Sequence, residues 1–290
     1  MHIKTVYCGF ATKVVMSGLV IAFTAGAWVF GQDPPTPAAP AAYKAEEPAN
    51  RGLDANLYMQ TAAEYRACCY QAYNLATFRL KEALAKQKTG KFAVVMDLDE
   101  TVLDNSGFQA MLLRSGLAFD QRLWDAWEGQ DSDKIALIPG AREFILEARK
   151  LGVSVIYISN RNNKSRDQTK KALTRLEIPV EADSLLKLSA GPNDKTTRRQ
   201  EVERDYTVLL YIGDNLRDFD EALRCSKIEN ETAEELERAI KARKDAVDKQ
   251  PAIWGQKWII LPNPAYGEWT KPLGRGRSDF DRLTPPARTR

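Results

Sequence analysis

Four apolar, β-branched runs alternate with helix-forming segments from residue 91 onward, and this alternation restricts the fold more than any other feature. Segments such as 141–152 and 165–177 have the composition of helices. Strands that are apolar on both faces and separated by helices predict a parallel sheet covered on both sides. We therefore expect an α/β protein with three layers. The apolar runs are 92–98 (FAVVMDL), 153–159 (VSVIYIS), 206–213 (YTVLLYIG) and 257–262 (KWIILP).

The N-terminal segment has the features of an export signal. Lys4 and Lys13 precede an uncharged apolar run at 14–31, which is typical of a signal peptide or an uncleaved signal anchor. A stretch rich in Pro and Ala follows, which predicts an extended linker. We therefore expect an exported protein, periplasmic or membrane-anchored and facing outward. Its membrane contact would be made through the N-terminal segment alone.

The segment before the first apolar run is helical in pattern. Residues 57–88 contain no Gly or Pro and many residues with high helix propensity. The end of the chain is rich in Gly, Pro and Arg, which predicts a loose tail. The expected parts are a signal peptide or anchor at 1–31, a linker at 32–54, a helical accessory segment at 55–90, the main α/β domain at 91–269 and a flexible basic tail at 270–290.

Composition excludes several kinds of chemistry. The one histidine, His2, precedes the folded part, which therefore has no histidine for a nucleophile, a general base or a His-rich metal site. The net charge of +3, without a basic stripe interleaved with aromatic residues, argues against a nucleic-acid partner. The absence of a CxxC pair argues against a zinc or thioredoxin-like site. A bridge from Cys68 or Cys69 to Cys225 stays open for an exported chain.

Carboxylates stand at the end of the first apolar run. Asp97 and Asp99 lie there, separated by one residue. In open parallel sheets, ligands bind at the carboxyl ends of the strands. Two crowded carboxylates repel each other unless a cation joins them, and a hard cation such as Mg²⁺ suits oxygen ligands. A cluster of surface charges would explain the acids but not their position directly behind an apolar strand.

Further polar residues occupy comparable positions later in the chain. Asp214 and Asp218 follow the third apolar run, and Ser159 closes the second. A hydroxyl with nearby backbone N–H groups is suited to holding phosphate oxygens. Lys195 stands at the start of a helical segment, where a fixed cation can neutralise a transferring phosphoryl group. Each signal alone is weak, but their order along the chain is specific.

These residues fall into ordered motifs that resemble a known family. Residues 97–101 (DLDET) match the DxDxT signature of the haloacid dehalogenase (HAD) superfamily of phosphatases, and Ser159, Lys195 and 213–218 (GDNLRD) resemble its later motifs. Longer stretches resemble acid phosphatases of subfamily IIIB, most closely the class C acid phosphatase and lipoprotein-e 5′-nucleotidase family. Over roughly 57–269, the resemblance implies a HAD-type, Rossmann-like domain. The stretches are DLDETVLDNS, IPGAREF, YISNR, GDNLRDF and LPNPAYGEW.

The resemblance implies a mechanism. Asp97 would attack phosphorus and form an aspartyl-phosphate, and Asp99 would protonate the leaving alcohol and later deprotonate the attacking water. Mg²⁺ would be held by Asp97, the backbone carbonyl of Asp99 and Asp214. Asp218 would hold a metal-bound water or the motif lysine. Relatives carry a lipid-accepting cysteine after the signal, and none stands there in this chain, which leaves lipid anchoring open.

The phosphate would be held by residues from the later motifs. The resemblance implies this role for Ser159, Asn160 and Lys195. Lys187 is the alternative motif lysine, but the spacing of Lys195 ahead of two arginines matches the family pattern better. Thr101 would steady the loop that carries the two catalytic aspartates.

Aromatic residues suggest the substrate class. Trp124, Trp127 and Tyr266 lie in segments that resemble those flanking the nucleobase in this family, and aromatic faces stack bases. Core or lid packing is the alternative for the two tryptophans. The expected substrates are nucleoside 5′-monophosphates, with nicotinamide mononucleotide among them. A broad acid phosphatase or a phosphotransferase is the second candidate.

Two other classes are weighed against this interpretation. DLDET also occurs in phosphatases that act on phosphoserine tails, but an exported enzyme with base-stacking aromatics fits that class poorly. A non-catalytic surface protein that binds nucleotides or metal would need no proton-transfer carboxylate at Asp99. The expected partner is therefore a small-molecule phosphomonoester. A homodimer, which is common among such relatives, stays open.

Overall fold

The computed structural model describes residues 52–274 except 130–131, 179, 181, 183–184 and 192, together with residues 282 and 283. These residues belong to one compact unit, residues 44–290. The signal segment at 1–31, nearly all of the linker at 32–54 and most of the tail at 270–290 lie outside the described residues. No helix within the described part is long and apolar enough to span a membrane.

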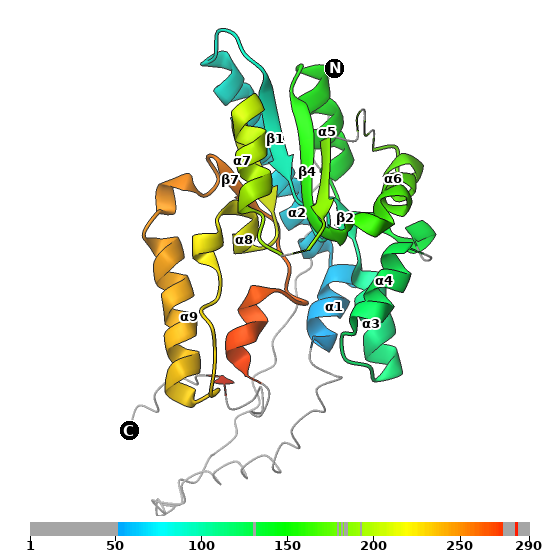
Figure 1. The fold of residues 1–290 in the computed structure, drawn as a ribbon, viewed down its shortest axis with the longest axis vertical. Coiled ribbons are helices and arrows are strands. Elements are labelled where there is room, and N and C mark those ends of the chain that lie inside the picture. Colours follow the sequence, from blue (N-terminus) through cyan, green and yellow to red (C-terminus); the bar gives the residue numbers. More distant parts are fainter. Residues whose placement is uncertain are drawn as a thin grey trace, which may run out of the picture. The chain divides into compact units, whose positions relative to one another are not determined.

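The centre of the fold is a five-stranded sheet in which every neighbouring pair is parallel. The strand order is β5-β4-β1-β6-β7, so the first strand lies in the middle of the sheet (Figure 1). Four of the strands coincide with the four apolar runs, and the predicted α/β architecture is confirmed. The strands are β1 (Phe92–Met96), β4 (Ser154–Asn162), β5 (Leu186–Ser189), β6 (Thr207–Gly213) and β7 (Trp258–Ile260).

Helices cover both faces of the sheet. One face packs against α2 and α5, and the other packs against α7 and α8. The alternation of β1 shows why both faces must be covered, because Val94 and Met96 belong to the first core and Ala93 and Val95 to the second. The helices are α1 (Leu53–Thr61), α2 (Ala63–Ala85), α3 (Ser106–Ser115), α4 (Gln121–Gly129), α5 (Ala141–Lys150), α6 (Arg166–Arg175), α7 (Thr196–Asp205), α8 (Leu216–Phe219) and α9 (Ala233–Asp248).

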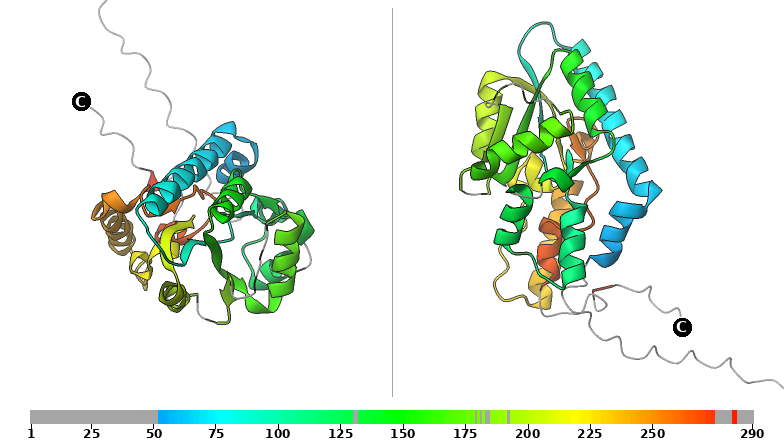
Figure 2. Two further views of the ribbon diagram at one scale, coloured as in Figure 1. Left: turned by 90° about the horizontal axis from the view of Figure 1, so that it is seen from above. Right: turned by 90° about the vertical axis from the view of Figure 1, so that its right-hand side faces the viewer.

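The helical segment expected at 55–90 is part of the main core. Helix α2 runs along one side of the sheet (Figure 2) and buries a stripe of residues spaced by three or four. Tyr73 in this stripe donates a hydrogen bond of 2.5 Å from its hydroxyl to the carbonyl of Thr101. The helix therefore supports the loop that follows β1. The stripe consists of Tyr65, Cys69, Tyr73, Ala76 and Leu80.

The three cysteines within the described residues are unpaired. Cys68 is exposed, whereas Cys69 and Cys225 are buried, and all three are free thiols. The bridge that the sequence left open is therefore not formed. Burial raises the pKa of Cys69 to about 11, which keeps this thiol protonated and unreactive at neutral pH.

A small cap follows β1. It consists of α3 and α4, framed by the antiparallel pair β2 (Leu103–Asp104) and β3 (Ala136–Leu137). In Figure 1, α1, α3 and α4 lie beyond one end of the sheet, with the orange-red helix η7 (Glu268–Leu273) nearby. The cap and η7 both contribute residues to the pocket described below.

Candidate active site

The site is built on the loop that leaves the central strand. The N–H of Asp97 still bonds the carbonyl of Ile212 on β6, at 2.9 Å. The chain then turns sharply, and three successive N–H groups, those of residues 101–103, converge on the carbonyl of Leu98. Glu100 adopts a left-handed conformation within this turn (φ 56°). The turn directs Asp97 and Asp99 into one pocket of about 500 Å³.

Lys195 lies at the base of this pocket. Its ammonium donates to Asp97 at 2.5 Å and to Asp218 at 2.7 Å, and its side chain is 4% exposed. Lys187, the alternative motif lysine, pairs instead with Glu201 at 2.8 Å and is absent from the described pocket lining. The geometry therefore favours Lys195 over Lys187.

Three carboxylates gather beside the lysine. Oxygen atoms of Asp97, Asp214 and Asp218 lie within 4.8 Å of one another, close enough to share one cation. Gly213 makes this approach possible, because a Cβ at that position would lie 2.5 Å from Asp218. Asp218 also closes a capping box with Asn215 at the start of α8. Asp218 thus joins the cluster directly, whereas the sequence analysis gave it only a supporting role.

The charge balance of the cluster fits a divalent cation. Burial raises the pKa of Asp97 to about 7, although Lys195 opposes this, and the charges of Asp218 and Asp99 add to the increase. Burial, followed by the charges of Asp218 and Asp97, raises the pKa of Asp214 well above its usual range. One ammonium does not balance three carboxylates, and the raised pKa values of Asp97 and Asp214 favour protons on these two carboxyls that a divalent cation would displace.

Two neighbours fix the position of Asp214. The amide of Asn263 donates to one of its oxygens at 2.8 Å, and the hydroxyl of Thr101 donates to the other at 3.4 Å. Thr101 is fully buried. Thr101 thus connects the loop after β1 to the loop after β6.

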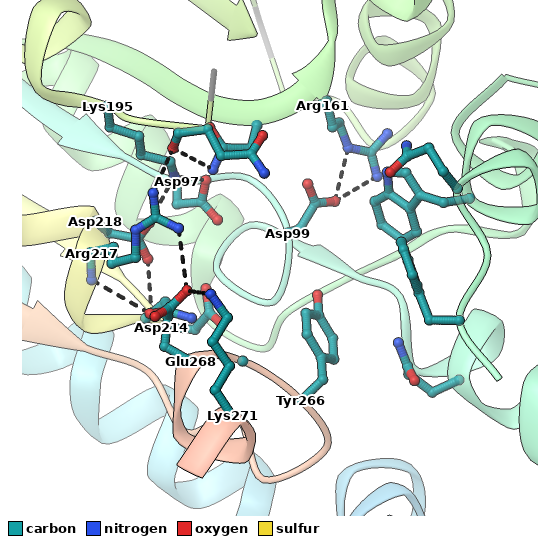
Figure 3. Close-up of a pocket in the computed structure, with 18 residues that line it drawn as sticks. Asp97, Asp99, Arg161, Lys195, Asp214, Arg217, Asp218, Tyr266, Glu268 and Lys271 are labelled. Atoms are coloured by element: carbon teal, nitrogen blue, oxygen red, sulfur yellow. Dashed lines mark hydrogen bonds and ion pairs between the residues drawn. The ribbon is translucent and has the colours of Figure 1, made fainter. Parts of the chain in front are cut away.

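Asp99 turns away from the carboxylate cluster. Figure 3 shows Asp97 facing Lys195 and Asp99 facing Arg161 on the other side of the pocket. Oδ1 of Asp99 accepts from Nε of Arg161 at 2.8 Å and from the Asn105 amide at 2.9 Å, and Nη2 of Arg161 forms an ion pair with it at 2.8 Å. The two aspartates therefore occupy different electrostatic environments, one near a lysine and two carboxylates, the other near a guanidinium.

Two of the three residues expected to hold phosphate, Ser159 and Asn160, lie on β4, and of these two only Asn160 belongs to the described pocket lining. Ser159 is fully buried, and its hydroxyl donates to Asp99 at 3.3 Å and accepts from the N–H of Arg161. Asn160 lines the pocket, where Arg198 bonds its amide oxygen at 2.7 Å. Asn160 also donates to the carbonyl of Asn193 at 3.1 Å. The phosphate-binding role of these residues stays a prediction.

The aromatic residues are divided between pocket and core. Trp124 and Tyr266 line the pocket, and Tyr266 points into it in Figure 3. Trp127 is 4% exposed, packs against Phe108 and is absent from the described pocket lining. The expectation that Trp127 stacks on a base is therefore not supported, because its ring has no free face. Phe119, which the sequence analysis missed, lines the pocket and is 60% exposed.

Other lining residues were also missed. Arg217 joins Glu221 at 2.9 Å and Glu268 at 3.3 Å, and Glu268 in turn pairs with Lys271. The second oxygen of Glu268 accepts the N–H of Cys225 at 3.0 Å. This network fixes η7, and with it the neighbouring Tyr266 loop, against the loop after β6. The GDNLRDF and LPNPAYGEW motifs contain Arg217 and Glu268, but neither motif reveals that the two side chains meet.

Comparison with known proteins decides the family. Residues 41–269 match the family model described as HAD superfamily, subfamily IIIB (acid phosphatase). A crystal structure of the class C acid phosphatase from Bacillus anthracis with tungstate bound is 34% identical, with a TM-score of 0.69, and covers 81% of this chain and 94% of its own. A second structure of that enzyme, also 34% identical, has a TM-score of 0.68 over the same shares. The chain belongs to the class C acid phosphatases of the HAD superfamily.

This acid phosphatase is a phosphomonoester hydrolase with a HAD fold, as the sequence motifs predicted. Enzymes of the superfamily use a divalent metal, and the buried carboxylates of Asp97, Asp214 and Asp218 provide a suitable cluster. The family agrees with the predicted substrate class, a small phosphate ester. Members of the family hydrolyse phosphate esters. An enzyme is therefore favoured over the alternative from the sequence, a non-catalytic surface protein that binds nucleotides or metal.

Proposed function

We propose that this acid phosphatase is an Mg²⁺-dependent 5′-nucleotidase that acts outside the cytoplasm and forms an aspartyl-phosphate on Asp97. The proposal rests on the different surroundings of two aspartates that line the same pocket. Asp97 lies against Lys195 and the carboxylate cluster, whereas Asp99 lies against Arg161. Asp97 is thus placed beside the ammonium of Lys195, where it can attack phosphorus. Asp99 is placed on the opposite side of the pocket, where it can transfer a proton.

Each step uses residues that face the pocket. An oxygen of Asp97 forms a bond to phosphorus while the bond from phosphorus to the leaving oxygen breaks. Lys195 offsets the negative charge of the phosphoryl group and of Asp97. When bound by Asp97, Asp214 and the backbone carbonyl of Asp99, with Asp218 beside them, Mg²⁺ supplies further charge neutralisation and orients the phosphate.

Asp99 handles the proton in both half-reactions. It gives a proton to the leaving alcohol, and its carboxylate then accepts one from the water that attacks the aspartyl-phosphate. Asn160 lines the pocket and Ser159, although fully buried, donates to Asp99, which supports a role for the two in holding phosphoryl oxygens. The Bacillus anthracis relative has tungstate bound, and because tungstate is a tetrahedral oxyanion like phosphate, this supports an oxyanion-binding site in the present enzyme.

The shape of the pocket supports a substrate larger than a simple alkyl phosphate. Its volume of about 500 Å³ falls within the range of pockets that bind small organic ligands. Trp124, Phe119 and Tyr266 place aromatic surface at the wall, which suits stacking on a base. Export to the periplasm or outer membrane surface is part of the proposal and rests on the apolar run at 14–31.

Phosphate release from a substrate panel tests the proposal. The full chain would be assayed with nucleoside 5′-monophosphates, nicotinamide mononucleotide, p-nitrophenyl phosphate, glycerol phosphate and a phosphoserine peptide, with Mg²⁺ or with chelator. We expect metal-dependent release that is fastest with nucleotides and absent in Asp97→Asn. Equal rates with all small esters would point to a broad acid phosphatase, and preference for the peptide would contradict the proposal. Adding alcohol acceptors would detect phosphotransfer.

A further inference from the structure

Asn105 connects the cap to the proton-transfer aspartate. It follows β2, is fully buried, and its amide lies between Asp99 and helix α4. The Nδ2 group donates to Asp99 Oδ1 at 2.9 Å. The Oδ1 atom accepts from the indole N–H of Trp127 at 2.8 Å and from Arg161 Nη2 at 3.2 Å. A single buried amide thus links one helix of the cap to the carboxylate expected to transfer the proton.

The orientation of this amide follows from the chemistry of its partners. An indole N–H and a guanidinium can only donate hydrogen bonds, so the carbonyl oxygen of Asn105 must face Trp127 and Arg161. The NH₂ group must then face Asp99, which accepts. Reversing the amide would bring donors against donors in a buried site and leave Asp99 without this partner. Trp127, whose bond is the shorter of the two, therefore acts together with Arg161 to fix which end of Asn105 meets the carboxylate. Longer bonds of 3.5 Å from the NH₂ group to Glu100 and to the carbonyl of Leu103 favour the same orientation.

The donors are distributed unevenly over the Asp99 carboxylate. Oδ1 accepts two hydrogen bonds from nitrogen, one from Arg161 Nε and one from Asn105, and Nη2 of Arg161 lies in ion-pair contact with it at 2.8 Å. Among the described residues, Oδ2 has one hydrogen-bond partner, the hydroxyl of Ser159 at 3.3 Å. An oxygen surrounded by donors has no room for a proton of its own. A proton on Asp99 must therefore reside on Oδ2.

We infer that Asn105, oriented by Trp127, is a positioning residue that holds Asp99 with Oδ2 available for proton transfer. This inference rests on the proposed function of Asp99. In the first half-reaction, an oxygen of Asp97 bonds to phosphorus, and the bond from phosphorus to the leaving oxygen breaks. The proton on Asp99 Oδ2 moves to that oxygen, which yields an alcohol, an aspartyl-phosphate and an ionised Asp99. Trp127 thereby acts through two hydrogen bonds without touching the substrate.

The dependence of the rate on the leaving group distinguishes a positioning role of Asn105 and Trp127 from a purely structural one. A loss of structure would slow all substrates alike, whereas a loss of proton transfer would slow only those whose leaving group needs a proton. A nitrophenolate is stable enough to leave unprotonated, whereas a nucleoside or alkyl alkoxide needs a proton. The measured quantity is kcat/KM, which reports formation of the aspartyl-phosphate, for a nucleoside 5′-monophosphate and for p-nitrophenyl phosphate. Trp127→Phe keeps an aromatic ring and removes the N–H donor. Asn105→Ala is a second variant that removes the amide itself.

Matched variants separate the possible causes of a loss. Trp254→Phe is the control, because the buried indole N–H of this partly buried residue has no hydrogen-bond partner among the described residues and its ring packs against the second core. Asp99→Asn is the reference for a complete loss of the acid. If Asp99→Asn shows no selectivity for the leaving group, the proposed function of Asp99 fails rather than the positioning role. Thermal melts with Mg²⁺ establish which variants are folded.

The expected result is selective. In Trp127→Phe, kcat/KM for the nucleotide should fall about tenfold, because one hydrogen bond to a charged network is lost. For p-nitrophenyl phosphate, kcat/KM should fall about twofold or less. Folded Asn105→Ala should show the same pattern with an equal or larger loss. Equal losses for both substrates, or behaviour like that of Trp254→Phe, would overturn the inference.

Discussion

The ammonium of Lys195 lies 2.5 Å from a carboxylate oxygen of Asp97, although 98 positions separate the two residues in the sequence. Asp97 directly follows the central strand β1, and Lys195 immediately precedes α7. The parallel sheet brings these positions together because the carboxyl ends of its strands share one edge. The pair places a fixed cation beside the residue proposed as the nucleophile.

Removing the ammonium should stop catalysis and destabilise the fold. Lys195→Met keeps the aliphatic stem but leaves Asp97 and Asp218 without their buried cation. We expect activity to fall by about 10²–10³-fold or more and the free energy of unfolding to fall by roughly 3 kcal/mol. Phosphate release and urea unfolding with saturating Mg²⁺ measure the two effects. In the matched control Lys187→Met, a partly exposed pair with Glu201 is lost, which should cost less than about 1 kcal/mol and leave activity intact. The reverse result would reassign the motif lysine.

A divalent cation should stabilise the fold through the carboxylate cluster. At about 100 times its dissociation constant, Mg²⁺ would add about 2.7 kcal/mol, equivalent to a rise in Tm of roughly 5–10 °C. Asp214→Asn removes one carboxylate of the cluster and should abolish most of this rise. In chelator the same variant should be at least as stable as the wild type, because burial already favours the neutral form of Asp214. Differential scanning calorimetry with and without metal measures both. A full metal-induced shift in Asp214→Asn would contradict the assignment.

The stability should decrease with rising pH because of Glu128. Burial raises its pKa from 4.5 to about 7, despite the opposing charge of Arg161. The folded state therefore keeps a proton that the unfolded state has released between pH 4.5 and 7. The stabilising contribution is complete below pH 4.5 and is lost as the pH passes 7, and its size is of the order of 3 kcal/mol at most.

Glu128→Gln should remove this part of the pH dependence. Between pH 5 and 8 in chelator, the free energy of unfolding of the variant should decrease by about 2 kcal/mol less than that of the wild type. Urea unfolding at a series of pH values measures the difference. Parallel curves for the two proteins would show that the buried Glu128 carboxyl does not keep its proton.

Tyr266 should contribute to nucleotide affinity but little to the affinity for simple phosphates. Its loop is tied to the metal cluster, because Asn263 accepts the N–H of Tyr266 and donates to Asp214. Tyr266→Ala removes a stacking surface worth about 1–3 kcal/mol and should raise KM for a nucleoside monophosphate by about tenfold. KM for glycerol phosphate should change by less than about twofold. Tyr266→Phe, which keeps the ring, should behave like the wild type, and equal effects on both substrates would contradict base stacking.

The sheet and the strand-end carboxylates could be predicted from sequence because their signals are local. Four continuous apolar runs specify buried parallel strands, and the acids follow those runs directly. The edge strand β5 was missed because its sequence, LKLS, is short and carries a lysine in its middle. The role of α2 was underestimated for a different reason. Its buried stripe is visible as a spacing, but the sequence does not say which surface the stripe covers.

The hydrogen-bond network around Asp99 could not be predicted because it joins distant segments. Arg161 lies 62 positions from Asp99, and nothing local to either residue indicates that they pair. Trp127 was ambiguous for a related reason, since a helical aromatic residue can face a pocket or a core. The close approach of its ring to Gly107, where a Cβ would lie 3.1 Å away, belongs to tertiary packing. Such contacts require the complete fold.

Chemical trapping of the phosphorylated residue tests the central claim most directly. Asp99→Asn and the wild type would be mixed with p-nitrophenyl phosphate, whose leaving group departs without a proton, and with Mg²⁺, then quenched in acid and treated with borohydride, which reduces an aspartyl-phosphate to homoserine. Mass spectrometry of the peptides then identifies the modified position. We predict homoserine at residue 97, with more of it in Asp99→Asn, where breakdown of the intermediate is slowed. Homoserine at another aspartate, or none in a wild-type enzyme that still turns over substrate, would contradict the proposal that Asp97 is the nucleophile.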